Sequence, residues 1–299
     1  IAPREVANDV IALAKEILDL LGWPTKEENE EPLSSTPTAL GVCFDLTAAT
    51  DCEKPTLVVA NKGGRIDDLV SLIARALKTN SLSQAEAARL RGQLVFANFQ
   101  CFGRLGAFAF HYLGRRADGG GSNRLSEELR WALRWWIQHL LNSEPRTIPL
   151  GRPQLPLIPF TGGFCDPDSD SPTGIQAGYG GLLFNPTDGT CEHFKARCSD
   201  QLLDVLSCSG KKKQLVGQVE LIPSLAARAI WSDKLEGRMV PHFVDNDAAR
   251  FALIKGPSPT RDSAWFAGAT WSQEATNASF SWSERVPSPS NPADGPSRG

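Results

Sequence analysis

The sequence predicts an α/β protein in two parts: a mainly helical region that carries a small β-hairpin, and then a domain built on a mixed β-sheet. The chain has 299 residues, which is enough for two hydrophobic cores. A proline-rich stretch, 146–154, has the composition of a linker. Before it, apolar residues mostly recur at helical spacing; after it, strands and helices alternate as in a mixed α/β layer. We therefore divide the chain into 1–62, 63–145, 146–154 and 155–299.

The beginning of the chain predicts one helix and one hairpin. Apolar residues recur at helical spacing through 8–23, from Val10 to Leu21. Residues 39–50 and 54–62 are two apolar runs joined by a polar turn. That pattern is typical of a β-hairpin.

Three helices are predicted after the hairpin. They span residues 66–80, 81–116 and 124–142. The second begins with Ser83 and Glu86, which have the spacing of a capping box. The third carries a broad apolar face of leucine, tryptophan and isoleucine.

Charge is unevenly distributed along the chain. The whole chain is close to neutral, with 31 basic and 34 acidic residues, so its overall composition does not indicate nucleic-acid binding. From Lys62 to Arg134, however, twelve Lys and Arg stand against six Asp and Glu, a net charge of +6. Such an excess suits a phosphate backbone, and a solvated helical surface is the alternative. In the same region Trp131, Trp135 and Trp136 either stack on bases or pack into a core.

The second part predicts an alternation of strands and helices. Strands are predicted over 155–165, 174–186, 190–197, 239–244 and 280–287. Helices are predicted over 201–207, 219–231 and 247–256. Residues 265–274 show no clear period and predict no element.

The stretch 239–256 changes period at Asp245 and Asn246, where a strand gives way to a helix. A carboxylate at the end of a buried strand is costly to desolvate unless a cation meets it, as in a magnesium site. The alternative, which this stretch taken alone favours, is that Asp245 or Asp247 caps the helix.

Taken together, these pieces resemble the end of a retroelement reverse transcriptase. Residues 155–299 resemble its ribonuclease H domain, through PFTGGFC, QVELIPSLAAR, FVDNDAARFALIKG and RVPSPSNPADGPSR. Residues 1–150 are similar to what precedes that domain, through ALGVCFDL and LSQAEAARLRGQLVFANFQCFGR. The resemblance implies the end of a polymerase palm over 1–62, a helical thumb/connection region over 63–145, and a mixed-sheet ribonuclease H-like domain over 155–299.

The resemblance also implies a chemistry, the hydrolysis of the RNA strand of RNA–DNA hybrids. Carried over to this sequence, the family's catalytic residues and metal ligands are Glu220, Asp245 and Asp294. Such a site holds two Mg²⁺ ions, with Mn²⁺ as an alternative; one ion activates the attacking water and the other stabilises the leaving oxygen. Carboxylate oxygens are the ligands that Mg²⁺ prefers.

One position departs from the family pattern. Where the family's first strand ends in a triplet such as Thr-Asp-Gly, this chain has Thr161, Gly162 and Gly163. The next acid, Asp166, would lie roughly 13 Å from residue 162 in an extended strand. We therefore expect impaired hydrolysis. The alternatives are a non-catalytic nucleic-acid-binding module and a decayed retroelement remnant.

The remaining sequence features concern the surroundings of the chain. Seven cysteines without framework spacing predict reduced thiols, and hence an intracellular protein of the cytoplasm or nucleus. No apolar run approaches membrane-spanning length, so no membrane partner is expected. The chain begins at Ile1 and contains no Tyr-x-Asp-Asp stretch. We therefore expect no polymerase active site here and, as partners, upstream polymerase domains of a longer polyprotein.

Overall fold

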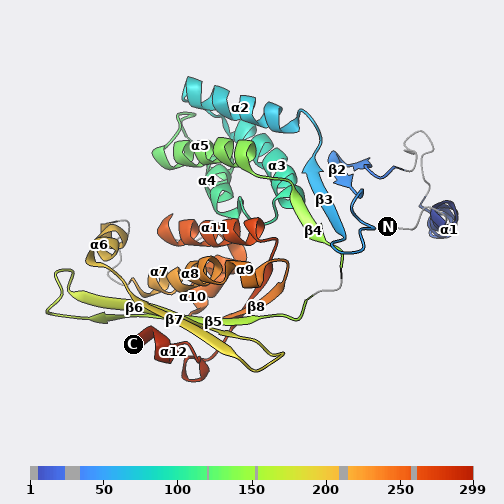
Figure 1. Cartoon of the computed structure of the whole chain (residues 1–299). Coiled ribbons are helices and arrows are strands. Elements are labelled where there is room, and N and C mark those ends of the chain that lie inside the picture. Colours follow the sequence, from blue (N-terminus) through green and yellow to red (C-terminus); the bar gives the residue numbers. More distant parts are fainter. Residues whose placement is uncertain are drawn as a thin grey trace.

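The computed structural model places a helical body beside a sheet domain (Figure 1). It describes residues 6–23, 34–119, 121–151, 154–208, 215–256 and 261–298. Helix α1 (Ala7–Leu20) confirms the helix predicted over 8–23 but ends three residues earlier, and Leu20 and Trp23 are exposed. Within the described ranges, no helix combines the length and the apolar character that crossing a membrane requires.

A small antiparallel sheet flanks the helical body. Its strands run in the order β1-β2-β3-β4 and span Thr38–Ala39, Val42–Asp45, Thr56–Asn61 and Arg146–Pro149. The pairing of β2 with β3 confirms the predicted hairpin. Strand β4 differs from the prediction, because 146–154 was expected to be a linker and its first residues pair with β3. Pro149 is tolerated at the end of β4, since an edge strand leaves backbone groups unpaired.

The four helices of the body are α2 to α5. They span Arg65–Thr79, Gln84–Cys101, Ala107–Asp118 and Glu127–Asn142. The capping box of Ser83 and Glu86 is present at the start of α3. The helix predicted over 81–116 is interrupted between α3 and α4, where Gly103 has φ 65° and its carbonyl accepts a hydrogen bond from Asn98 Nδ2 at 2.8 Å. The left-handed backbone of Gly103 explains the break.

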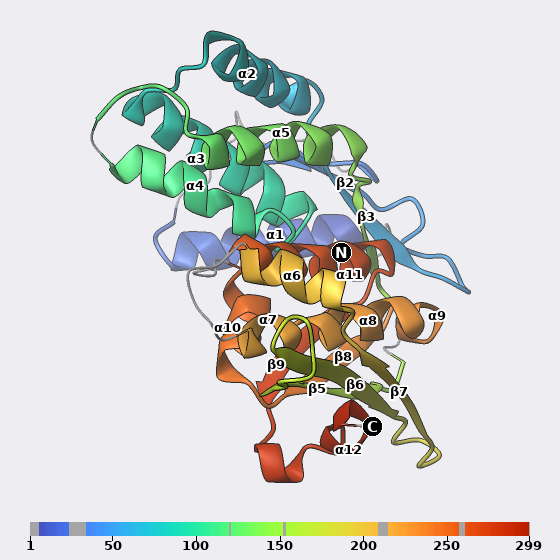
Figure 2. The same ribbon diagram turned by 90° about the vertical axis from the view of Figure 1, so that its left-hand side faces the viewer.

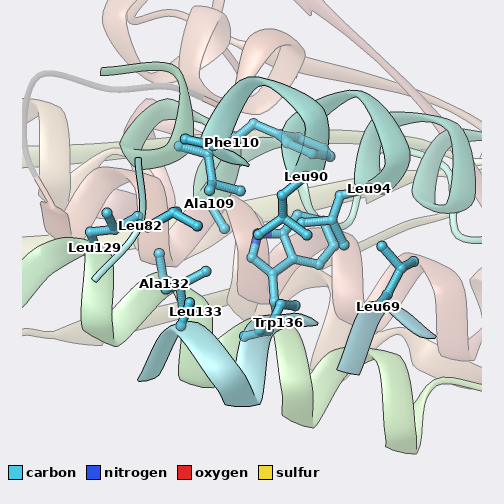
Figure 3. Close-up of a cluster of buried hydrophobic side chains, with 14 of the residues drawn as sticks. Leu69, Leu82, Leu90, Leu94, Ala109, Phe110, Leu129, Ala132, Leu133 and Trp136 are labelled. Carbon is cyan, nitrogen blue, oxygen red and sulfur yellow. The ribbon is translucent and has the colours of Figure 1, made fainter. Parts of the chain in front are cut away.

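The tryptophans of α5 belong to the core of the helical body. Trp136 is fully buried among leucine, alanine and phenylalanine side chains (Figure 3). Trp131 and Trp135 are partly buried against the same cluster. Of the two sequence interpretations, the packed core is therefore confirmed, and base stacking by Trp136 is wrong because no face of its ring is accessible.

The sheet of the second part is mixed and has the strand order β7-β6-β5-β8-β9. Its strands, in chain order β5 to β9, span Ile158–Pro167, Ile175–Phe184, Cys191–Arg197, Met239–Val244 and Phe280–Arg285. Strands β5, β6 and β7 are antiparallel to one another, whereas β8 runs parallel to β5 and to β9. This order confirms the predicted mixed-sheet, ribonuclease H-like α/β fold.

Helices cover both faces of this sheet, unequally (Figures 1 and 2). One face carries most of the helices, and α12 lies on the other. The helices of the sheet domain are α6 (Asp200–Cys208), α7 (Val216–Val219), α8 (Ile222–Ile230), α9 (Ser232–Leu235), α10 (Asp247–Lys255), α11 (Arg261–Thr276) and α12 (Asp294–Arg298). Helix α11 was missed because it contacts both α8 and α4, so its apolar residues do not gather on one stripe.

Glycines let α12 lie directly on the sheet. A Cβ atom at Gly180 would come within 2.7 Å of the Ser297 nitrogen and 3.0 Å of the Phe194 carbonyl oxygen. At Gly178 it would come within 3.1 Å of the Ser297 oxygen. Because these neighbours are backbone atoms, only glycine permits this approach.

We predict that Gly180→Ala destabilises the sheet domain by about 1–3 kcal/mol, because α12 must shift to make room for the methyl group. Chemical denaturation measures the change. Gly295→Ala is the matched control: a Cβ there meets no atom within 4 Å, so we expect no loss of stability. Equal stabilities of the two variants would contradict the close approach.

Candidate active site

The candidate site lies where β8 ends beside the middle of its parallel neighbour β5. Thr161 of β5 is paired with Val244, the last residue of β8. The residues that follow, Gly162 and Asp245, therefore lie next to each other at the carboxyl end of β8.

Glu220 reaches this point from the helical layer. It lies between α7 and α8, whereas the sequence placed it in the first turn of a single helix. Its Oε2 atom accepts a hydrogen bond from the Gly163 backbone N–H at 2.9 Å. Glu220 is buried, at 6% exposure, and this bond holds its carboxyl group against the middle of β5.

Asp245 is free of a capping role. The side chain of Asn246 caps α10 and accepts a hydrogen bond from the Ala249 N–H at 3.0 Å. Asp247 is engaged with Arg250, at 3.3 Å. The proposed cap by Asp245 or Asp247 is therefore wrong: Asn246 takes that place because its amide oxygen reaches the first turn. Asp245 Oδ1 is buried and has no hydrogen-bond partner.

The acids near this point influence one another electrostatically. The pKa of Glu220 is raised to about 8, chiefly by burial and next by the charge of Asp245. A hydrogen bond between the side chains of Glu220 and Asp245 and the charge of Asp294 act in the same direction, whereas the bond from Gly163 opposes them. The buried Glu220 beside Asp245 thus favours its protonated form.

Asp294 belongs to the same surroundings but has a cationic partner. It begins α12, and its Oδ1 accepts a hydrogen bond from Arg298 Nε at 3.1 Å. Arg298 also lies 3.7 Å from the carboxylate of Asp166 and over the ring of Phe164, 5.6 Å from its centroid. Asp166 remains in extended β5, opposite Gln176. The chain therefore does not turn back to bring Asp166 beside residue 162.

The side-chain amide of Asn291 borders residue 162, the position at which the family pattern has an acid. Asn291 is buried, and its Nδ2 donates to the Thr161 carbonyl at 3.1 Å. A Cβ atom built on Gly162 would come within 3.0 Å of the same Nδ2. Sequence reasoning did not single out Asn291 or Arg298, although both lie in the segment SNPADGPSRG that carried the resemblance.

The residues present do not fit the pair of metal ions that the resemblance implies. The donor chemistry is suitable, since Asp245 offers a buried oxygen without a partner. However, residue 162 has no carboxylate, and Asp294 is paired with Arg298. Across the part of the chain that the structure describes, no three His, Cys, Asp or Glu side chains form a group able to hold a metal ion. The site therefore consists of two neighbouring acids, Glu220 and Asp245, and a third acid, Asp294, that is paired with Arg298.

A separate cavity lies on the helical body. It has a volume of about 490 Å³ and lies between the start of α2 and the middle of α3. Lys62, Arg65 and Phe96 line it, and the Arg65 guanidinium lies over the Phe96 ring, 4.8 Å from its centroid. The other lining residues are Gly63, Asp68, Leu69, Leu72, Gly92 and Gln93. Two cations and one aromatic ring thus meet in a hollow inside the basic region noted in the sequence.

No protein-family model matches the sequence, and no curated protein is detectably similar to it. Among solved structures, the chain is similar to ribonuclease H1 of Halobacterium salinarum, at 15% identity and a TM-score of 0.34 over 48% of this chain and 94% of that one. The N-terminal ribonuclease H domain of a Mycobacterium tuberculosis protein gives 12% identity and the same TM-score, over 48% and 92%.

A foamy viral protease-reverse transcriptase is similar over more of the chain. Its structure in complex with an RNA/DNA hybrid gives 10% identity and a TM-score of 0.34, covering 98% of this chain and 56% of that one. At such identities and TM-scores, the fold assignment rests on the strand order and pairing of the sheet itself.

We predict that Glu220→Gln stabilises the metal-free protein at alkaline pH. In the folded protein the pKa of Glu220 is about 8, above its ordinary value of 4.5, so the fold favours the protonated acid. Stability from this group is fully present below pH 4.5 and is lost as pH rises through 8. Glutamine cannot ionise, so we expect a gain on the order of 2–4 kcal/mol at pH 8.5 and little change at pH 4.5.

Urea denaturation in a chelating buffer at both pH values measures this difference. Glu236→Gln replaces an exposed acid outside the site and serves as the control. A gain for Glu220→Gln that is the same at both pH values would show that the carboxyl group is not destabilised by its neighbours.

Proposed function

We propose that this chain is the C-terminal portion of a retroelement reverse transcriptase whose ribonuclease H-like domain holds RNA–DNA hybrids but cuts them poorly. The observation that carries the proposal is the position of Gly162, beside Asp245 and next to the Gly163 N–H that binds Glu220. Two acids, Glu220 and Asp245, adjoin this point, and the residue between them offers none.

The same observation accounts for weak hydrolysis. Cleavage of a phosphodiester by this family's route requires carboxylates that hold two divalent ions, Mg²⁺ or Mn²⁺. Here Glu220 and Asp245 face each other, while Arg298 neutralises Asp294. Under this proposal Glu220, Asp245 and Asp294 are the remaining members of an incomplete set of ligands.

Binding is attributed to the helical body, under the proposal the thumb/connection region that follows the last part of the palm. The cavity of Lys62, Arg65 and Phe96 combines cations for phosphates with a flat ring for a sugar or a base. Because the Arg65 guanidinium is held over the Phe96 ring, its position is fixed before a ligand arrives. This cavity supports the assignment of a nucleic-acid duplex as the partner.

The test is Gly162→Asp. Among the described residues, a Cβ atom at this position meets Asn291 Nδ2, the end of a side chain, and no backbone atom of a residue distant in the chain within 4 Å. We expect cleavage of the RNA strand of an end-labelled hybrid, in Mg²⁺ or Mn²⁺, to rise by orders of magnitude over wild type, with duplex DNA uncut. Asp166→Asn is the comparison: it should leave wild-type activity unchanged, because Asp166 is bound to Arg298.

Two results would contradict this proposal. One would overturn the assignment of a nuclease site, and the other would change the set of acids that form it. If Gly162→Asp is folded and binds the hybrid but does not cut, the site is not a nuclease site. If wild type already cuts well and Asp166→Asn abolishes cutting, Asp166 supplies the missing acid. Gly162→Asp with Glu220→Gln should be inactive, which excludes a contaminating nuclease.

We predict that hybrid binding falls steeply with salt and that Arg65→Ala lowers the slope of log Kd against log salt by about one unit, since one phosphate contact is lost. Fluorescence anisotropy at several salt concentrations measures the slope. Lys234→Ala is the control, because Lys234 is exposed on the sheet domain and bound to Glu192. Binding that does not depend on salt would contradict a phosphate-binding cavity.

A further inference from the structure

The helical body and the sheet domain meet at the turn between α3 and α4. Phe108 packs against Gly268 of α11 so closely that a Cβ at Gly268 would come within 2.7 Å of the ring. Trp271 of the same helix packs with Leu105, in the turn before α4. The two parts therefore share a continuous apolar contact.

Arg104 projects from this turn into the sheet domain. Its Nη1 donates to the Leu253 carbonyl at 3.3 Å, and its Nη2 contacts Glu274 Oε2 and the Ser281 carbonyl, both at 3.1 Å. Its guanidinium also lies 5.6 Å from the centroid of the Trp271 ring. One side chain of the helical body thus touches α10, α11 and β9 at once.

These contacts continue inward to the strand that carries Asp245. Glu274 also pairs with Arg228, at 3.7 Å, and Arg228 is completely buried. Arg228 donates a hydrogen bond to Ser281 Oγ. Ser281 is paired in β9 with Val240 of β8, the strand that leads to Asp245. Arg104 is therefore linked to β8 through Glu274, Arg228 and the pairing of β9 with β8.

We propose that Arg104 is a positioning residue that fixes the helical body relative to β8, and so sets the length of duplex between the cavity of Lys62, Arg65 and Phe96 and the candidate active site. The proposal rests on the proposed function, because it concerns where a bound hybrid is cut. Arg104 touches neither substrate nor reacting groups. Its role depends on the planar guanidinium, which can contact two carbonyls and a carboxylate together, whereas a lysine ammonium cannot span them.

The first experiment measures how rigidly the helical body is held against the sheet domain, and it does not rely on activity. Cys52 and Cys191 are exposed, on the hairpin side and on β7, and carry spin labels once the other five cysteines are replaced by alanine. We expect one narrow distance distribution for the parent chain and a broadened one for Arg104→Ala. Arg104→Lys keeps the charge beside Glu274 and should give an intermediate width. Lys234→Ala, which removes a cation from a surface ion pair, should match the parent.

The second experiment measures the cutting position. With Gly162→Asp restoring cleavage, an end-labelled hybrid should give one dominant product, and adding Arg104→Ala should spread the products over neighbouring positions. Unchanged distances and an unchanged product pattern in both Arg104 variants would overturn the proposal. Should Arg104→Ala fail to fold, Arg104→Lys decides alone. If the chain binds no hybrid, the proposed function is refuted. The distances between the spin labels still test whether Arg104 fixes the helical body against the sheet domain.

Discussion

The parallel pairing of β5 with β8 is the constraint on which the candidate site depends. Only two residue pairs register the strands, Phe160 with Phe243 and Thr161 with Val244. Side chains secure this short ladder on both faces: the rings of Phe160 and Phe243 stack with centroids 5.1 Å apart, and on the helical side Thr161 Oγ1 lies 2.8 Å from His242 Nε2. Burial lowers the pKa of His242 to about 3, so this contact is made by a neutral imidazole at physiological pH. A slip of one residue would separate position 162 from Asp245.

Charge balance explains the rest of the site. Glu220 and Asp245 are brought together by the fold rather than by mutual attraction, and the pKa of Glu220 is raised first by its burial and then by the charge of Asp245. Arg298 pairs with Asp294 and Asp166 at the half-exposed rim of the site. The site therefore combines a buried acid with a raised pKa, Glu220, and an acid paired with an arginine, Asp294.

Local patterns predicted most of the elements, and long-range contacts account for what they missed. Strand alternation, the helical stripes and the cap at Ser83 depend on residues that are close together in the sequence, so local patterns predict them. Helix α11 was missed because it lies between two partners. The spacing of neighbouring residues does not show whether Asn246 or an adjacent acid caps α10. The choice depends on which side-chain oxygen reaches the backbone N–H groups of the first turn. Arg298 and Arg104 gain their roles only through residues far away in the chain, which no spacing rule reveals. The resemblance supplied Glu220, Asp245 and Asp294, and the geometry adds what each is bound to.

On one face of the sheet, packing requires glycine at some positions but not at residue 162. Gly178 and Gly180 are required, because backbone atoms of α12 or β7 occupy the place of any side chain. Gly162 lies on the same face, yet it has no left-handed backbone, and within the described ranges a Cβ there would meet the end of the Asn291 side chain rather than backbone. The fold therefore does not demand glycine at 162. Its presence changes the number of acids at the carboxyl end of β8 while leaving the scaffold intact, which is why activity and binding are expected to separate in this chain.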